Sequence, residues 1–474
     1  MIKTKRAIIL GIVLAIALFA PLFAALAITR SNQTLDLALT ASYEIAAQLS
    51  PEDKLLTYEE YVRVSNRGTD AAKSLYFHLY GNLYKTNDAG ITVLSATDGG
   101  GRPLSFKMKD DDQLIYLTLN EPLEGGTEAT ITFSCAAAMP EMTRRYGVAR
   151  DGEIQMPFFY PQLAVYDEVG WRTEPMQDVS DGRYAEMSDY ELAITAPREY
   201  LVAANGTEVS RTEDESMVTY TFAAHDRRDL VFIAYNDYAR FERDIGGTKL
   251  IGYFNRNRLD AETMERMMVD AEFALDYFST VYTEYPYETL VITNSGWATK
   301  TNISMEYSGL FTVSPAMDFD RIVYHEAAHQ WFYSLVGNDE NSEPWLDESL
   351  AEFSSLLCSE AAGEDCAAWW ELMKIQADTV AGNSLDSAWD ETEVSTNLFY
   401  GRGAFFLKEL MDAIGKEIFL AILSEYCNRF AFQNATTQNF LDVLYQHTEP
   451  DVEEIVARYI RVPIDLTLNE AVLS

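Results

Sequence analysis

The sequence has 474 residues, of which 48% are hydrophobic, enough for two or three domains with a large core. Acidic side chains number 74 against 36 basic ones, giving a formal net charge of −38 at pH 7. So acidic a chain repels nucleic acid and anionic lipid surfaces, and we therefore expect no nucleic-acid partner. None of the four cysteines stands in a Cys-x-x-Cys pair, which argues against a cysteine zinc site.

The N-terminus predicts a membrane anchor. The basic sequence "KTKR" (3–6) precedes an uncharged stretch of 22 residues, Ala7 to Ile28, and about 20 apolar residues cross a bilayer as a helix. We expect a single-pass transmembrane helix within residues 1–30. Cleavage after the small-residue pattern at 25–27 is the alternative. The position of the basic residues places the rest of the chain outside the cytoplasm, held at the cell membrane, or secreted if cleavage occurs.

Residues 31–245 are expected to form an all-β domain, either a sandwich or a saddle-shaped sheet. In "TITFSC" (130–135) hydrophobic and polar residues alternate, so that the second, fourth and sixth share one face. The sequence "MVTYTF" (217–222) alternates in the same way. Glycine-rich segments such as "TDGGGRP" (97–103) supply the turns between expected strands.

The pattern changes to helical spacing near residue 260. The segment "DAETMERMMVDAEFALDYFSTVY" begins at Asp260, the expected N-cap, and carries apolar residues along one face. Two short strands are expected at 288–294 and 309–314, followed by helices from about 318 to 461. This order predicts a multidomain protein, in which an α+β, mostly helical catalytic domain at 246–474 follows the all-β domain.

The strongest local motif is "HEAAHQWF" (325–332). His325 and His329 stand one helical turn apart on the same face, where two imidazoles bind one cation. Glu326 lies about 100° round the helix from His325 and reaches a metal-activated water without occupying a ligand position. The alternative is a pair of core histidines satisfied by hydrogen bonds. The whole chain has only five histidines, so two at this spacing favour the metal site.

A catalytic zinc ion needs a third protein ligand and an open position. Glu348, in "PWLDESLAEF" (344–353), follows His329 by 19 residues, so a helix, a turn and a second helix would bring it beside the histidines. Asp347 and Glu352 are competing candidates. Glu352 lies one turn beyond Glu348, where it can support the ligands from behind. An ordinary carboxylate in the first turns of a helix is the alternative reading of Glu348.

These spaced motifs resemble the gluzincin aminopeptidases, the zinc metallopeptidase group of membrane alanyl aminopeptidase. "HEAAHQWF" and "WLDESLAEF" (345–353) stand at the family's spacing, and "SMEYSGL" (304–310) resembles its Gly-x-Met-Glu-Asn strand. "YGRGAFFL" (400–407) is similar to the family's Tyr-x-Lys-Gly helix start. Weaker similarity runs back through "FFYPQLAVYDEVGW" (158–171). The resemblance implies a thermolysin-like catalytic domain, in a short form without the family's C-terminal helical domain.

The resemblance also implies a role for each of six polar side chains. By this resemblance the zinc ligands are His325, His329 and Glu348. Glu326 is the general base and Tyr400 supplies the oxyanion-stabilising hydroxyl. Glu306 is the carboxylate that binds a substrate's amino group. One zinc ion is the implied cofactor. The family has Gly-Ala and Asn where this sequence has Ile303-Ser304 and Tyr307, which changes the walls of the substrate groove.

We therefore predict a zinc-dependent metallopeptidase, an aminopeptidase that hydrolyses N-terminal residues from peptides with a zinc-activated water and Glu326 as general base. The expected partners are peptide substrates, and the membrane through the N-terminal helix. One alternative is a binding or scaffold component of a membrane complex, which the anchor and the large β domain favour and an intact Glu326 opposes. The other is an endopeptidase-type zinc hydrolase, for which Glu306 would not select free amino groups.

Overall fold

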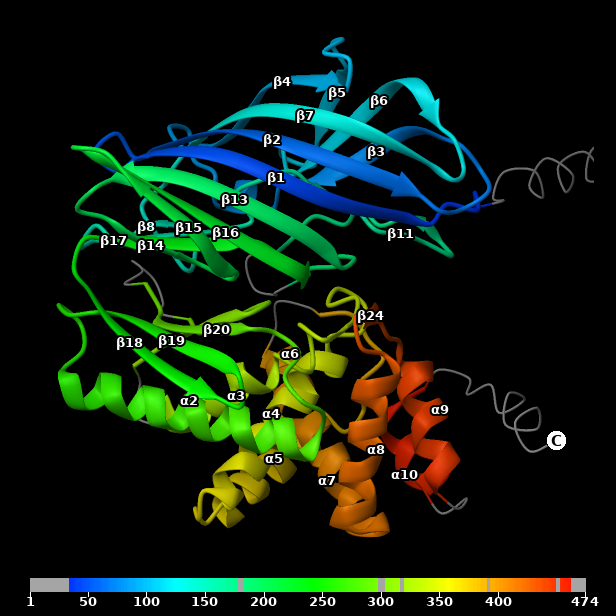
Figure 1. Ribbon diagram of the computed structural model, residues 1–474. Coiled ribbons are helices and arrows are strands. Elements are labelled where there is room, and N and C mark those ends of the chain that lie inside the picture. Colours follow the sequence, from blue (N-terminus) through cyan, green and yellow to red (C-terminus); the bar gives the residue numbers. More distant parts are fainter. Residues whose placement is uncertain are drawn as a thin grey trace, which may run out of the picture.

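The computed structural model describes residues 34–177, 182–296, 303–315, 319–389, 393–448 and 452–461. They form two parts, a β-rich N-terminal half and a half in which one sheet is covered by helices (Figure 1). This arrangement confirms a β-rich domain followed by a mostly helical one. The anchor predicted at 1–30 lies outside the described residues. Across the ranges given above, no helix is both long enough and apolar enough to span a membrane.

Three sheets surround the core of the β domain. The largest has the order β15 (Thr207–Glu213), β16 (Met217–Arg227), β13 (Ser188–Pro197), β1 (Leu39–Ser50), β2 (Leu55–Asn66), β7 (Thr127–Ala138), β4 (Gly90–Asp98). The second has the order β10 (Gln162–Leu163), β3 (Ala72–His78), β6 (Leu114–Leu123), β5 (Ser105–Lys109). The third has the order β14 (Leu201–Ala204), β17 (Val231–Tyr235), β9 (Ile154–Pro157), β8 (Gly147–Val148).

Alternation along the strands determines which face of the large sheet is buried. On β7, Ile131, Phe133 and Cys135 all point into the core, as the period of two predicts, while Ser134 between them is only half-buried. The inward residues of β1, β2 and β13 join them in one continuous hydrophobic cluster. The opposite face of this sheet carries mostly short polar side chains and alanines.

The second half of the chain, which the sequence predicts to be catalytic and which we call the catalytic half, is built on a five-stranded sheet. Its order is β18 (Tyr238–Ile245), β19 (Thr248–Asn255), β20 (Thr289–Asn294), β22 (Leu310–Val313), β21 (Met305–Tyr307). Strands β19, β20 and β22 are parallel to one another, and β21 is an antiparallel edge strand. The boundary expected at residue 245 falls inside the β18–β19 hairpin, so the second sheet already begins at Tyr238.

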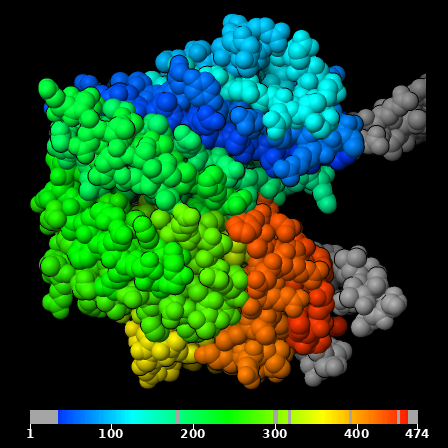
Figure 2. All heavy atoms as spheres, in the orientation of Figure 1, coloured from blue at the N-terminus to red at the C-terminus, as the bar shows by residue number. Residues whose placement is uncertain are grey.

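This sheet separates the β domain from the helices. On β20, Leu290 and Ile292 pack into the helical core, whereas Val291 packs with Phe158 and Tyr235 of the β domain. In the space-filling view, the green residues that end the β domain and begin the catalytic half form one continuous surface (Figure 2). The two halves therefore share a buried apolar interface along the sheet.

Helices follow on the far side of the sheet, as the sequence predicts. Asp260 caps the first one, accepting a hydrogen bond of 2.8 Å from the Thr263 N–H. The helices are α2 (Ala261–Val281), α3 (Phe319–Ala328), α4 (Trp345–Ala361), α5 (Ala367–Thr379), α6 (Glu393–Thr396), α7 (Gly403–Ile414), α8 (Lys416–Arg429), α9 (Thr437–His447) and α10 (Glu453–Tyr459). Helices α3 and α4 pack together through the central cluster.

Candidate active site

The three predicted zinc ligands converge between α3 and α4. His325 lies in the last turn of α3, His329 directly follows that helix, and Glu348 lies in the first turn of α4. The two Nε2 atoms are 3.1 Å apart, and Glu348 Oε2 lies 3.4 Å and 3.6 Å from those of His325 and His329. The potential ligand atoms all fall within 4.8 Å of one another. The fold thus brings together the group predicted from the 19-residue spacing.

Each imidazole has an oxygen acceptor near its Nδ1 atom, on the side away from the ligand cluster. His329 Nδ1 lies 3.0 Å from the Phe332 carbonyl oxygen, which can only accept, so Nδ1 carries the proton and Nε2 presents a lone pair to the cluster. His325 Nδ1 lies 3.1 Å from Glu352 Oε2. Arg321 in turn donates a 2.6 Å hydrogen bond to Glu352 Oε1. Glu352 is therefore the supporting group behind a ligand rather than the ligand itself.

The electrostatics of this cluster favour a cation at its centre. Burial would lower the pKa of His325, but the carboxylates of Glu348 and Glu352 outweigh it and raise the pKa to about 9. Burial would likewise raise the pKa of Glu348, but the two imidazoles hold it well below its usual range. Glu348 Oε2 is buried and has no hydrogen-bond partner among the described residues. Two imidazole nitrogens and one carboxylate oxygen so placed fit one zinc ion with an open fourth position.

Glu326 and Tyr400 lie beside the three ligands. Tyr400 is carried by a π-helical segment, η2 (Asn397–Arg402), a kind of local distortion often found at functional sites. Its hydroxyl donates a 2.6 Å hydrogen bond to Glu348 Oε1, and its ring centroid lies 5.8 Å from that of His325. Glu326, on α3 next to His325, is 5% exposed. The side chains assigned to proton transfer and to charge stabilisation thus share one wall.

A hollow of about 490 Å³ opens over this wall. His325, Glu326 and Tyr400 line its floor. Trp369 and Arg321 also line the hollow, and the Arg321 guanidinium lies 4.3 Å from the Trp369 ring centroid. The apolar side chains around it are Ile303, Ile322, Trp369, Leu372 and Met373. Sequence reasoning missed Arg321, although it stands four residues before His325 and so shares its helix face.

Glu306 lies on edge strand β21 and is 4% exposed. Its carboxylate forms an ion pair with Arg183, which comes from the β domain. It is close enough to His329 to raise the pKa of that imidazole, which settles at about 9 even though burial alone would lower it. Arg183 could not be found from the sequence, because it lies in an irregular segment without periodicity.

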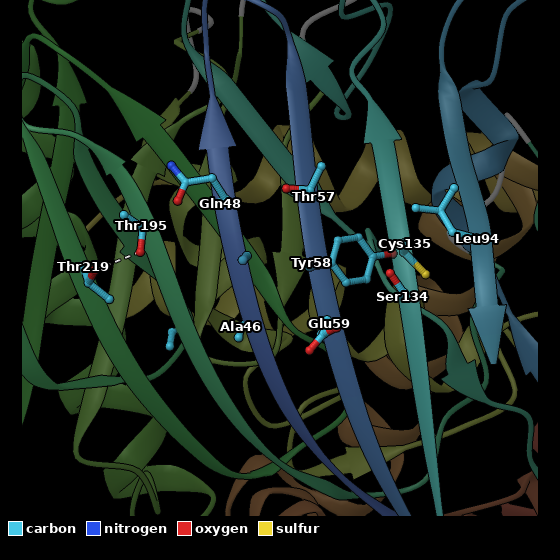
Figure 3. A pocket seen from close by; sticks show the side chains of 12 residues that line it. Ala46, Gln48, Thr57, Tyr58, Glu59, Leu94, Ser134, Cys135, Thr195 and Thr219 are labelled. Atoms are coloured by element: carbon cyan, nitrogen blue, oxygen red, sulfur yellow. Dashed lines mark hydrogen bonds between the residues drawn. The ribbon is translucent and has the colours of Figure 1, made fainter. Parts of the chain in front are cut away.

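A second hollow, of about 390 Å³, lies over the outer face of the seven-stranded sheet, far along the chain from the histidines. Figure 3 shows the side chains that line it. Thr195 and Thr219 are joined by a 2.8 Å hydrogen bond, and Ser134 and Glu59 lie on neighbouring strands. None of its lining residues is a histidine.

The fold thus places a His-His-Glu cluster that could hold one metal ion between two packed helices. Residues 263–459 match the family model described as "Peptidase family M1 domain". The family resemblance found in the motifs is confirmed by this match.

Known relatives extend the similarity to both halves of the chain. "Probable aminopeptidase 1" of Sulfurisphaera tokodaii is 20% identical over 441 residues, covering 86% of this chain and 52% of the relative. "Glutamyl aminopeptidase" of Mus musculus is 26% identical over 57% of this chain and 31% of the relative. The chain therefore spans about half the length of the first relative and about a third of the second.

Solved structures share the fold. The M1 zinc metallopeptidase from Deinococcus radiodurans superimposes with a TM-score of 0.68 at 18% identity, over 91% of this chain and 96% of that one. A variant of that enzyme, solved with a Tyr-Ser-Ala substrate, also has a TM-score of 0.68, at 19% identity, over 90% of this chain and 96% of that one.

Proposed function

We propose that this protein is a zinc-dependent aminopeptidase that hydrolyses N-terminal residues from peptides. The observation that carries the proposal is the convergence of His325, His329 and Glu348 beneath a hollow that also exposes Glu326 and Tyr400. A purely structural pair of histidines would have no need of an open hollow beside it. The proposal is supported by the M1 family match and by relatives that are named aminopeptidases.

Zinc bound by these ligands would polarise the scissile carbonyl and lower the pKa of a water to about 7. Glu326 is placed to accept the proton of the attacking water and to return it to the leaving amine. The Tyr400 hydroxyl is a neutral donor for the negative charge that develops on the carbonyl oxygen. In this structure the hydroxyl donates to Glu348 Oε1, which holds it beside the ligand cluster.

Selection of free amino groups is assigned to Glu306. A buried carboxylate pairs favourably with an ammonium group when water is excluded. This role separates an aminopeptidase from the endopeptidase alternative, because an N-acetylated peptide has no ammonium to bind. A peptide substrate is also supported by the similar M1 enzyme of Deinococcus radiodurans, a variant of which was solved with a Tyr-Ser-Ala substrate.

The test is peptide hydrolysis by the purified protein. Short peptides with a free N-terminus should lose their first residue, N-acetylated ones should be cleaved far more slowly, and a chelator should abolish turnover until zinc is restored. Metal analysis of His325→Ala should show that bound zinc is lost. Equal cleavage of free and acetylated peptides would remove Glu306 from its role, and chelator-resistant cleavage would overturn the zinc mechanism.

We further propose that residues 1–30 attach the protein to the cell membrane with the catalytic half outside the cytoplasm. The uncharged stretch after "KTKR" supports this proposal. Fractionation of expressing cells tests it. The chain should be found in the membrane fraction at full length and should be accessible to protease added from outside; a shortened soluble product would show cleavage instead.

A further inference from the structure

We propose that the β domain holds the substrate-recognising strand β21 in position, with Arg183 as the residue that fixes the Glu306 carboxylate. The proposal rests on the function proposed above for Glu306. It makes recognition of a peptide's amino group depend on a side chain from the other domain.

Arg183 contacts Glu306 in two ways. Its Nη2 forms the ion pair with the Glu306 carboxylate, and its Nη1 donates a 3.3 Å hydrogen bond to the Glu306 backbone oxygen. The same guanidinium therefore restrains the side chain and the main chain of one residue. An arginine suits this task because its planar fork makes several directed hydrogen bonds at once.

Two more β-domain side chains hold Ser308, the residue that directly follows the strand. The Ser308 N–H donates to Asp229 Oδ1 at 3.1 Å, and Asn205 Nδ2 donates to the Ser308 oxygen at 2.9 Å. The inner side of β21 pairs with β22. The β-domain contacts therefore satisfy the Glu306 carbonyl of the edge strand and both backbone groups of Ser308 just beyond it.

Arg183 is itself firmly anchored. Its backbone N–H donates to Glu340 Oε2 at 3.0 Å, and its Nη2 lies 3.2 Å from Glu340 Oε1. The guanidinium also stacks on the Tyr333 ring at 4.3 Å, and the Tyr333 hydroxyl donates to Asp229 Oδ2 at 2.5 Å. With a φ of 141°, Tyr333 adopts a backbone conformation that side-chain-bearing residues rarely hold unless their surroundings impose it.

We call the contacts of Arg183, Asp229 and Asn205 with Glu306 and Ser308 the clamp. The clamp is connected to the metal cluster through the segment after α3. The Ser334 N–H donates to the His329 backbone oxygen at 2.9 Å, and the Ser334 and Ser308 hydroxyls are 2.7 Å apart. The amine-binding strand and the backbone of a zinc ligand are thus held in one hydrogen-bonded unit. A shift of β21 of about 1 Å would misplace the substrate relative to that ligand.

Arg183→Met is the informative variant, and Arg172→Met is its matched control. Arg172 also comes from the β domain and also pairs with a catalytic-half carboxylate, that of Asp339, but it does not touch β21. For free-amine peptides Arg183→Met should raise KM by about ten- to a hundredfold, with a smaller change in kcat. The slower cleavage of N-acetylated peptides should be unchanged, so discrimination between the two substrates falls. Arg172→Met should keep the wild-type ratio.

A double variant separates positioning from general destabilisation. If Arg183 acts through Glu306, Arg183→Met should reduce discrimination no further in a Glu306→Gln background. If Arg183→Met does not fold, Arg183→Lys replaces it. This variant keeps the charge but loses the planar fork, so its KM for free-amine peptides should lie above the wild-type KM. A folded Arg183→Met or Arg183→Lys with wild-type discrimination overturns the proposal.

Hydrogen exchange tests the clamp without any substrate. Amides of residues 305–308 should exchange faster in Arg183→Met than in Arg172→Met, and unchanged protection would contradict the clamp. If the wild-type protein cleaves no peptide at all, the proposed function fails, while the exchange result still decides whether Arg183 holds β21.

Discussion

Two of the hollows on the described part of the protein differ in chemistry far more than in size. The one on the β-sheet measures about 390 Å³ and the one over the histidines about 490 Å³. The first is lined mostly by alanine, serine and threonine, together with Gln48, Glu59 and Leu94 among others (Figure 3). The second holds His325, whose pKa is raised to about 9, together with two carboxylates, Glu326 and Glu352, and a tyrosine. A potential metal ligand beside two carboxylates and a tyrosine, and not volume, distinguishes the hollow over the histidines.

The two hollows also differ in the secondary structure that forms them. The sheet hollow lies on the outer face of regular strands, where alternation places short side chains toward solvent. The reactive hollow lies where regular structure ends or is distorted: the end of α3, the start of α4 and the π-helical η2. Such ends allow side chains from distant segments to converge on one point, which a flat strand surface does not.

Replacing one carboxylate in each hollow should give the largest contrast. Glu326→Gln should lower kcat/KM by roughly a thousandfold, because the proton acceptor is lost while the zinc ligands remain. Glu59→Gln, the matched change in the sheet hollow, should leave kcat/KM as it was. Steady-state kinetics and metal analysis of both variants test this. Full activity in Glu326→Gln would break the distinction between the hollows.

Removing the Tyr400 hydroxyl should have the next largest effect. Tyr400→Phe should reduce kcat by about a hundredfold, since a donor to the developing oxyanion is worth roughly 2.7–4 kcal/mol in other hydrolases. KM should change little, because the donor acts mainly in the transition state. An unchanged kcat, in protein that retains its zinc, would leave Tyr400 with only its hydrogen bond to Glu348.

The apolar wall should affect substrate choice rather than chemistry. Trp369→Ala removes a large surface from the reactive hollow and should lower kcat/KM about tenfold for peptides with bulky apolar side chains, but not for alanine peptides. Its neighbour Trp370 packs on Phe353 and does not line the hollow, so Trp370→Ala is the control. A uniform loss across all peptides would show that Trp369 supports the fold instead.

The smallest effect is expected in the sheet hollow. Thr195→Val removes its hydrogen bond with Thr219 and should lower the free energy of unfolding by less than about 1 kcal/mol. Peptidase activity should not change. Denaturant unfolding and steady-state kinetics measure the two quantities. A loss of activity would mean that this hollow also takes part in catalysis.

The zinc triad could be predicted from the sequence because it depends on local geometry. The spacing of His325 and His329 fixes their common face, and the 19 residues to Glu348 allow a helix, a turn and a return. Tyr400 and Glu306 needed the family resemblance, because a lone tyrosine or glutamate carries no spacing signal. Their contacts with Glu348 and Arg183 are visible only in the structure.

Other features could not be predicted, for a physical reason in each case. Arg183 meets Glu306 across 123 residues of chain, and such a pairing depends on how the two halves dock. The boundary expected at 245 was displaced because β18 alternates like the strands before it, although it pairs with β19. Alternation shows that a strand exists, but it does not show which sheet the strand joins.

The five-stranded sheet has a practical consequence for dissecting this protein. The region that matches the M1 domain begins at residue 263, yet β18 and β19 lie before it and supply two of the five strands. A fragment cut at that residue would expose the flank of β20 and uncover the face that Val291 buries. It would also lose every β-domain contact to β21. The matched region is thus smaller than the sheet to which it belongs, and expression fragments should retain the chain from the β domain onward.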